Sequence, residues 1–137
     1  LAAADPQVPQ TAEFGDTIRF LGHDLDAENP TEITLYWQSI APTETNYDVF
    51  IHVVNAAGEI VAQVDREPVG GLAPTSFWQP GDIIRDPLPL NLPPDLPAGE
   101  YVVQAGLYVR ETGERLRLSG AGSTGDTVFL QAFDWPG

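Results

Sequence analysis

The chain has 137 residues, which suits one domain with a sizeable buried core. It contains 20 acidic residues against six arginines and has a formal net charge of -14, so we expect its surface to repel nucleic acids and anionic bilayers. Cysteine is absent, which excludes disulfides, thiol nucleophiles and cysteine-ligated zinc. No run of about 18 apolar residues occurs, so the chain itself is not expected to insert into a membrane.

The start of the chain is rich in small and polar residues and includes Pro6 and Pro9. This composition predicts an extended lead-in or linker over 1–12. The sandwich domain is expected over 13–131, followed by a tail over 132–137. No internal repeat is present, so a single domain accounts for the organisation.

Between these ends, short segments of alternating apolar and polar residues are separated by Gly, Pro, Asn or Asp. The predicted strands are 17–23, 32–40, 46–55, 59–66, 82–90, 100–110, 114–118 and 126–131. Long helical periodicity is missing. About eight short strands of this kind predict an all-β fold, a two-sheet immunoglobulin-like sandwich.

Two hairpin turns are specified by their residues. Asn55-Ala56-Ala57-Gly58 predicts a type I turn with a left-handed glycine closing a bulge, and Arg110-Glu111-Thr112-Gly113 repeats the scheme. With Asn55 opposite Glu59, the first hairpin is expected to place His52 beside Ala62. The same register would place Asp48 opposite Arg66 as an ion pair.

Three tryptophans divide between strand and loop. Trp37 lies in an alternating run and is expected in the core. Trp78 lies in a loop that ends in a Pro-Gly turn, where a ring can either close the end of the core or lie exposed as a stacking surface for a sugar or peptide. The closing role is favoured. Trp78, Gln79 and Asp82 are nevertheless the candidate ligand-binding residues, because they supply a ring and two polar groups within five residues.

The acidic segment around Asp24, Asp26 and Glu28 is a weak candidate for a calcium site. Asn29 stands where a calcium loop of the EF-hand type needs glycine, and Leu35 stands where it needs a bidentate glutamate. We therefore expect a solvated turn and no tight metal site. Of the two histidines, His52 alternates with apolar residues and is expected to be a core or half-buried side chain.

Gly120, Gly122 and Gly125 match the spacing of a dinucleotide-binding loop. Such a loop works only when it follows a strand and opens a helix. Here the predicted strand 126–131 follows, so the segment is expected to be a flexible loop. No cofactor site is predicted.

Several segments of the chain form a combined pattern. They are Phe14-Gly15-Asp16 with Ile18, Leu21-Gly22, Asp24-Leu25, Leu35-Tyr36-Trp37-Gln38, Val49-Phe50-Ile51-His52, Pro74-Thr75 with Trp78-Gln79-Pro80-Gly81-Asp82, Pro97-Ala98-Gly99-Glu100-Tyr101, Gly106-Leu107-Tyr108 and Thr112-Gly113-Glu114-Arg115-Leu116. Together they resemble a bacterial β-sandwich module, which is commonly the C-terminal extracytoplasmic region of multi-spanning membrane proteins. Many of these proteins are similar to lipid-linked-sugar glycosyltransferases. The family has no established catalytic residues, so the resemblance assigns none.

The resemblance implies a periplasmic or cell-surface location as part of a larger bacterial protein. The leading hypothesis is a non-catalytic binding or spacer module appended to a membrane or cell-envelope protein, with any catalysis residing in the parent protein. One alternative is a carbohydrate-binding module that recognises a glycan through loop aromatics. A hydrolase is a further alternative, and it would need a cleft with a close carboxylate pair. The expected partners are a glycan or an envelope protein.

Overall fold

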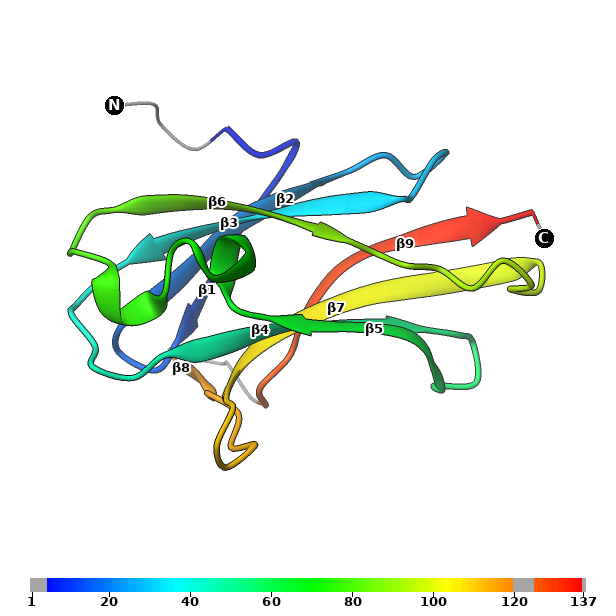
Figure 1. Cartoon of the computed structure of the whole chain (residues 1–137). Helices are drawn as coiled ribbons and strands as arrows, with labels where there is room; N and C mark the ends of the chain where they lie inside the picture. Colours follow the sequence, from blue (N-terminus) through cyan, green and yellow to red (C-terminus); the bar gives the residue numbers. More distant parts are fainter. Residues whose placement is uncertain (1–4, 120–124, 137) are drawn as a thin grey trace.

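The computed structural model describes residues 5–119 and 125–136, and over these residues it contains nine strands in two antiparallel sheets (Figure 1). The strands are β1 Val8–Phe14, β2 Ile18–Leu25, β3 Glu32–Ser39, β4 Tyr47–Val54, β5 Ile60–Arg66, β6 Ile83–Pro89, β7 Gly99–Val109, β8 Leu118–Ser119 and β9 Val128–Trp135. The first sheet has the order β6-β3-β2-β1-β8 and the second the order β5-β4-β7-β9. The predicted fold class, an all-β two-sheet sandwich, is confirmed. In the described part of the chain, no helix has the length and apolar character needed to cross a bilayer.

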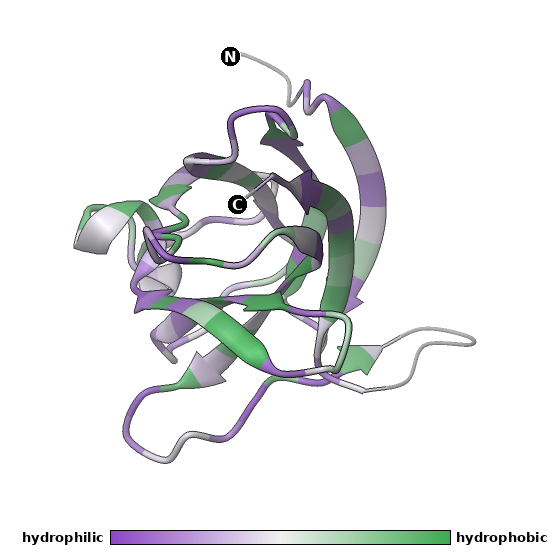
Figure 2. Cartoon of the chain, turned by 90° about the vertical axis from the view of Figure 1, so that its right-hand side faces the viewer, coloured by the Kyte–Doolittle hydropathy of each residue, from purple (hydrophilic) through white to green (hydrophobic). Residues whose placement is uncertain are grey.

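The core lies between the two sheets and follows from the two-residue period of the strands. Apolar and polar positions alternate along several strands (Figure 2). On β4, the alternate residues Val49, Ile51 and Val53 are fully buried in the core. From the first sheet, the ring of Trp37 enters the same core and meets Phe20 edge-on at 5.3 Å between centroids.

Strand β1 occupies much of the segment that was predicted as a lead-in. It pairs with β2 from Val8 opposite His23 to Phe14 opposite Ile18. Gly22 makes this approach feasible, because a Cβ there would lie 2.4 Å from the carbonyl oxygen of Val8. The prolines near the start of the sequence argue against a strand there, because proline has no N–H to donate to a neighbouring strand. In the structure Pro9 lies opposite Gly22, and the register of the two strands shifts between Pro9 and Ala12.

The C-terminal half also differs from the predicted boundaries. The segment predicted as a tail continues β9 as far as Trp135, which lies opposite Gly99. Within it Phe133 is buried and stacks on Tyr101 at 5.8 Å. The predicted strand 114–118 is reduced to an isolated bridge between Tyr108 and Arg115 and the two-residue strand β8.

The predicted register of the first hairpin holds only at the turn. The Asn55 amide donates to the Glu59 carbonyl at 2.9 Å, as expected. A register shift between Val53 and Val54 then moves His52 from Ala62 to Gln63. The predicted Asp48–Arg66 ion pair was therefore wrong: Asp48 pairs with Arg110 at 2.9 Å, and Arg66 donates to the Pro87 carbonyl.

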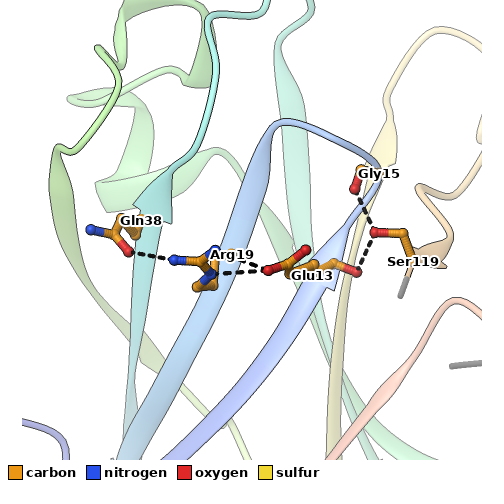
Figure 3. Close-up of polar contacts among 5 residues, drawn as sticks. All are labelled: Glu13, Gly15, Arg19, Gln38 and Ser119. Atoms are coloured by element: carbon orange, nitrogen blue, oxygen red, sulfur yellow. Dashed lines mark hydrogen bonds and ion pairs between the residues drawn. The ribbon is translucent and has the colours of Figure 1, made fainter. Parts of the chain in front are cut away.

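Polar side chains tie together the outer face of the first sheet (Figure 3). Arg19 on β2 donates to Glu13 on β1, at 2.9 Å from Nη2 to Oε2, and to Gln38 on β3 at 3.4 Å. The Ser119 hydroxyl on β8 donates to the Gly15 carbonyl at 2.6 Å. In these contacts, polar groups of the first sheet bond to one another.

Replacing Trp37 with Ala should destabilise the domain by about 3–5 kcal/mol, because it removes a fully buried indole that packs against Phe14 and Phe20. Urea denaturation measures the loss. Phe77→Ala is the control, because this side chain is 75% exposed and should cost less than about 0.5 kcal/mol. A loss below about 1 kcal/mol for Trp37→Ala would contradict the packing described above.

Candidate functional site

A cavity of about 490 Å³ opens on the outer face of the second sheet. We call it the outer-face cavity. Its walls combine aromatic, amide, carboxylate, imidazole and guanidinium groups within one concave surface. It is lined by Phe50, His52, Gln63, Asp65, Tyr108, Gly113 and Arg115.

The alternation along β4 places two of these side chains. Because Val49, Ile51 and Val53 face the core, Phe50 and His52 between them face outward. The register puts His52 opposite Gln63 on β5 and opposite Gln104 on β7. The strand therefore supplies the floor of the cavity.

The Phe50 ring lies over β7, where the sequence provides a glycine. Gly106 is opposite Phe50, and a Cβ at Gly106 would lie 2.3 Å from the Phe50 ring. Any larger residue would displace the ring. Although it lies on the outer face, Phe50 is buried.

The Arg115 side chain lies over the Phe50 ring. The turn after β7 closes with a hydrogen bond from the Gly113 amide to the Val109 carbonyl at 2.7 Å, and Arg115 then bridges back to Tyr108. Its guanidinium carbon lies 4.5 Å from the centroid of the Phe50 ring, in cation–π geometry. Asp126 accepts from Arg115 Nη1 at 3.3 Å. The planar cation is thus held over the cavity by a ring and a carboxylate.

Two side chains of the cavity, His52 and Tyr108, keep defined protonation states near neutral pH. Burial, assisted by the Arg115 cation, lowers the pKa of His52 below its ordinary value, so the imidazole is neutral and offers one donor and one acceptor. Burial and the nearby carboxylates of Asp65 and Asp48 raise the pKa of Tyr108 to about 12, so its hydroxyl stays protonated. Gln63 Nε2 donates to Asp65 Oδ2 at 2.7 Å, which orients both groups.

Trp78 does not present an open ring. It is 5% exposed, belongs to the core cluster and donates from Nε1 to the Ala73 carbonyl at 2.9 Å. In the following turn, the backbone N–H of Gln79 donates to Asp82 Oδ2 at 2.9 Å. Trp78 therefore closes one end of the core, whereas Gln79 and Asp82 lie exposed in the turn beside it. Stacking on Trp78 would require the ring to leave the core.

The connection that carries Trp78 is fixed by several polar contacts. It contains two short 3-10 helices, η1 Pro68–Gly71 and η2 Thr75–Phe77. The Thr75 hydroxyl donates to the Thr45 carbonyl at 2.6 Å, and Asp86 accepts from the Val69 amide at 2.7 Å. Burial raises the pKa of Asp86. These groups hold the loop and lie outside the outer-face cavity.

Two carboxylates of the acidic segment, those of Asp24 and Asp26, accept hydrogen bonds from other residues of the chain. The Asp24 carboxylate accepts from the backbone N–H of Gln7 at 2.7 Å and from the Tyr36 hydroxyl at 2.6 Å. Asp26 accepts from the Glu28 amide at 3.0 Å, which forms a turn. Within residues 5–119 and 125–136, no three His, Asp or Glu side chains gather in a metal-binding arrangement. Gly120 and Gly122 of the glycine-rich segment lie outside the described residues.

His23 joins the two sheets but takes no part in the cavity. It is fully buried on β2, and with the proton on Nε2 it donates to Gln131 Oε1 on β9 at 2.8 Å. Its Nδ1 is buried and has no hydrogen-bond partner among the described residues. Burial lowers the pKa of His23, so the neutral ring is the form that the folded state favours.

Trp78→Ala should lower the free energy of unfolding by about 3 kcal/mol or more, because the ring is a buried plug that also satisfies the Ala73 carbonyl. Trp78→Phe is the matched variant, which keeps most of the volume and loses about 1 kcal/mol with the hydrogen bond. Chemical denaturation measures both. Equal stability of wild type and Trp78→Ala would show that the ring does not support the core.

The buried histidines should make the domain acid-sensitive. Their pKa values are lowered from 6.5 in the folded state, so the unfolded chain binds more protons as the pH falls below about 6.5. We expect the free energy of unfolding to decrease from pH 7.5 to pH 5.5, with a shallower decrease in His23→Gln. Asp86, whose raised pKa acts in the opposite direction, is present in both proteins and cancels in the comparison. Parallel pH profiles of wild type and variant would contradict the role assigned to His23.

No protein-family model matches the chain, and no curated protein matches it. Its function must therefore be inferred from the geometry and chemistry of the outer-face cavity.

Proposed function

We propose that this chain is a non-catalytic extracytoplasmic module that binds a glycan of the cell envelope through the outer-face cavity. The observation that carries the proposal is the concave group of planar polar side chains around the Arg115–Phe50 pair. The sandwich provides a rigid support for this group, since its floor is β4, an inner strand of the second sheet.

The groups of the cavity suit a ligand rich in hydroxyls. A sugar hydroxyl both donates and accepts, and the cavity offers donors from Arg115, acceptors from Asp65 and both kinds from Gln63 and the neutral His52. Planar groups can bond two neighbouring hydroxyls at once. The partly buried ring of Tyr108 adds an apolar surface for the C–H groups of a sugar.

The carboxylate content of the cavity supports binding without catalysis. Among the described residues that line it, Asp65 supplies the one carboxylate, whereas most glycosidases use a pair that flanks the scissile bond. The resemblance to extracytoplasmic modules of membrane proteins supports a location outside the cytoplasm. On this proposal, any glycosyl transfer or hydrolysis takes place in the parent protein, and this domain holds or senses the glycan.

Calorimetric titration against a panel of soluble bacterial envelope polysaccharides tests the proposal. We expect at least one member to bind saturably, and Arg115→Ala to weaken that binding by about tenfold to hundredfold, because hydrogen bonds to a charged group are the stronger kind. Arg19→Ala is the matched control: both arginines pair with a carboxylate on an outer sheet face, and their side chains are 36% and 41% exposed for Arg19 and Arg115. The proposal fails if no polysaccharide binds, or if both variants weaken binding equally.

A further inference from the structure

The outer face of the second sheet carries a row of side chains that continues beyond the cavity. His52 on β4 lies opposite Gln63 on β5 and opposite Gln104 on β7, and Gln104 lies opposite Phe129 on β9. Residues directly opposite each other in antiparallel strands project from the same face. The four side chains therefore form one line across all four strands, which we call the transverse row.

Phe129 ends the row with an accessible aromatic ring. Its side chain is 55% exposed, although its neighbours Val128 and Leu130 are buried in the core. The backbone beneath it is held by the first sheet, because Gln10 Nε2 of β1 donates to the Phe129 carbonyl at 3.0 Å. A single exposed phenylalanine is ordinary on a protein surface. Its position places this ring beside Gln104, at the end of a line that continues through His52 to Gln63.

The length of the row matches a short oligosaccharide. Adjacent strands lie about 4.8 Å apart, so three spacings separate Gln63 from Phe129 by about 14 Å. A pyranose unit in an extended glycan advances by a similar distance to one strand spacing. Each strand would thus meet roughly one sugar ring, with amide or imidazole groups for the hydroxyls and the Phe129 ring for a C–H face.

The charges of this face favour an uncharged glycan. Gln63, Gln104 and the neutral His52 supply the polar groups of the row. Arg115, the arginine that lines the cavity, is already paired with Asp126, while Asp65 adds a negative charge at the cavity end. The whole chain carries a formal net charge of -14, which repels acidic polymers at long range.

We infer that the binding site is the outer-face cavity together with the transverse row, and that it takes an uncharged oligosaccharide segment of about three to four sugar rings laid across the strands. This inference rests on the proposed function. On this inference, Gln104 and Phe129 belong to the binding site, and the site binds uronic-acid-bearing and phosphate-bearing polymers more weakly than uncharged ones.

Length-resolved binding tests the inference. The probes are neutral oligosaccharides of glucose, mannose, galactose and N-acetylglucosamine, each from one to six units, with oligogalacturonates of the same lengths as acidic counterparts. We expect affinity for a neutral series to rise with length and level off at about three to four units. Acidic oligomers should bind more weakly at every length.

Two variants and two matched controls locate the ligand. Phe129→Ala and Gln104→Ala should each weaken binding of the tetrasaccharide by about threefold to tenfold and leave the monosaccharide unaffected. Phe77→Ala removes a ring that is 75% exposed elsewhere, and Gln38→Ala removes an amide from the outer face of the other sheet; neither should change binding. Melting temperatures of all four variants verify that they are folded.

The outcomes separate this inference from the proposed function. If Arg115→Ala weakens binding while affinity is independent of length and Phe129→Ala behaves like Phe77→Ala, the cavity binds a glycan and the transverse row is refuted. Acidic oligomers that bind as tightly as neutral ones would also refute the inference. If no sugar binds at any length, both proposals fail.

Discussion

Strand β4 is buried on both of its faces, and the rest of the structure depends on this double burial. Its inward residues Val49, Ile51 and Val53 fill the space between the sheets. Because side chains alternate along a strand, Phe50 and His52 between them must face outward, where they would be exposed unless other parts of the chain covered them. Strand β4 therefore needs other parts of the chain to cover Phe50 and His52 on its outer face, just as it needs the core on its inner face.

The cover on the outer face also creates the candidate site. Gly106 leaves room for the Phe50 ring, and the turn after β7 returns Arg115 over that ring at 4.5 Å. An arginine is suited to this position, because its stem and planar head can lie on an aromatic surface while its N–H groups remain available. Burial in turn keeps His52 neutral by lowering its pKa. The contacts that bury the outer face of β4 thus also form the candidate site.

Much of the architecture could be predicted from the sequence, because period-two alternation and turn residues are local signals. Strands β2 to β7 follow from such signals, and so do the core position of Trp37 and the turn at Gly58. Strand β1 was not recognised because Pro9 argues against a ladder, and only the three-dimensional approach at Gly22 makes the pairing feasible.

The candidate site was much less predictable, since it depends on register and on contacts between distant segments. A one-residue shift beside Val54 decides that His52 faces Gln63 rather than Ala62. Arg115 reaches Phe50 only because the turn after β7 folds back over the sheet. Loop position drew attention to Trp78, yet burial and a hydrogen bond place that ring in the core.

The proposed recognition surface is the outer face of the second sheet. Amide chemical-shift mapping of the 15N-labelled domain, titrated with the neutral oligosaccharide of highest affinity, tests this assignment. We expect the largest shifts to cluster on β4, β5 and β7 around His52, Gln63 and Gln104. Shifts concentrated around Trp78, or on the outer face of the first sheet around Arg19, would contradict it.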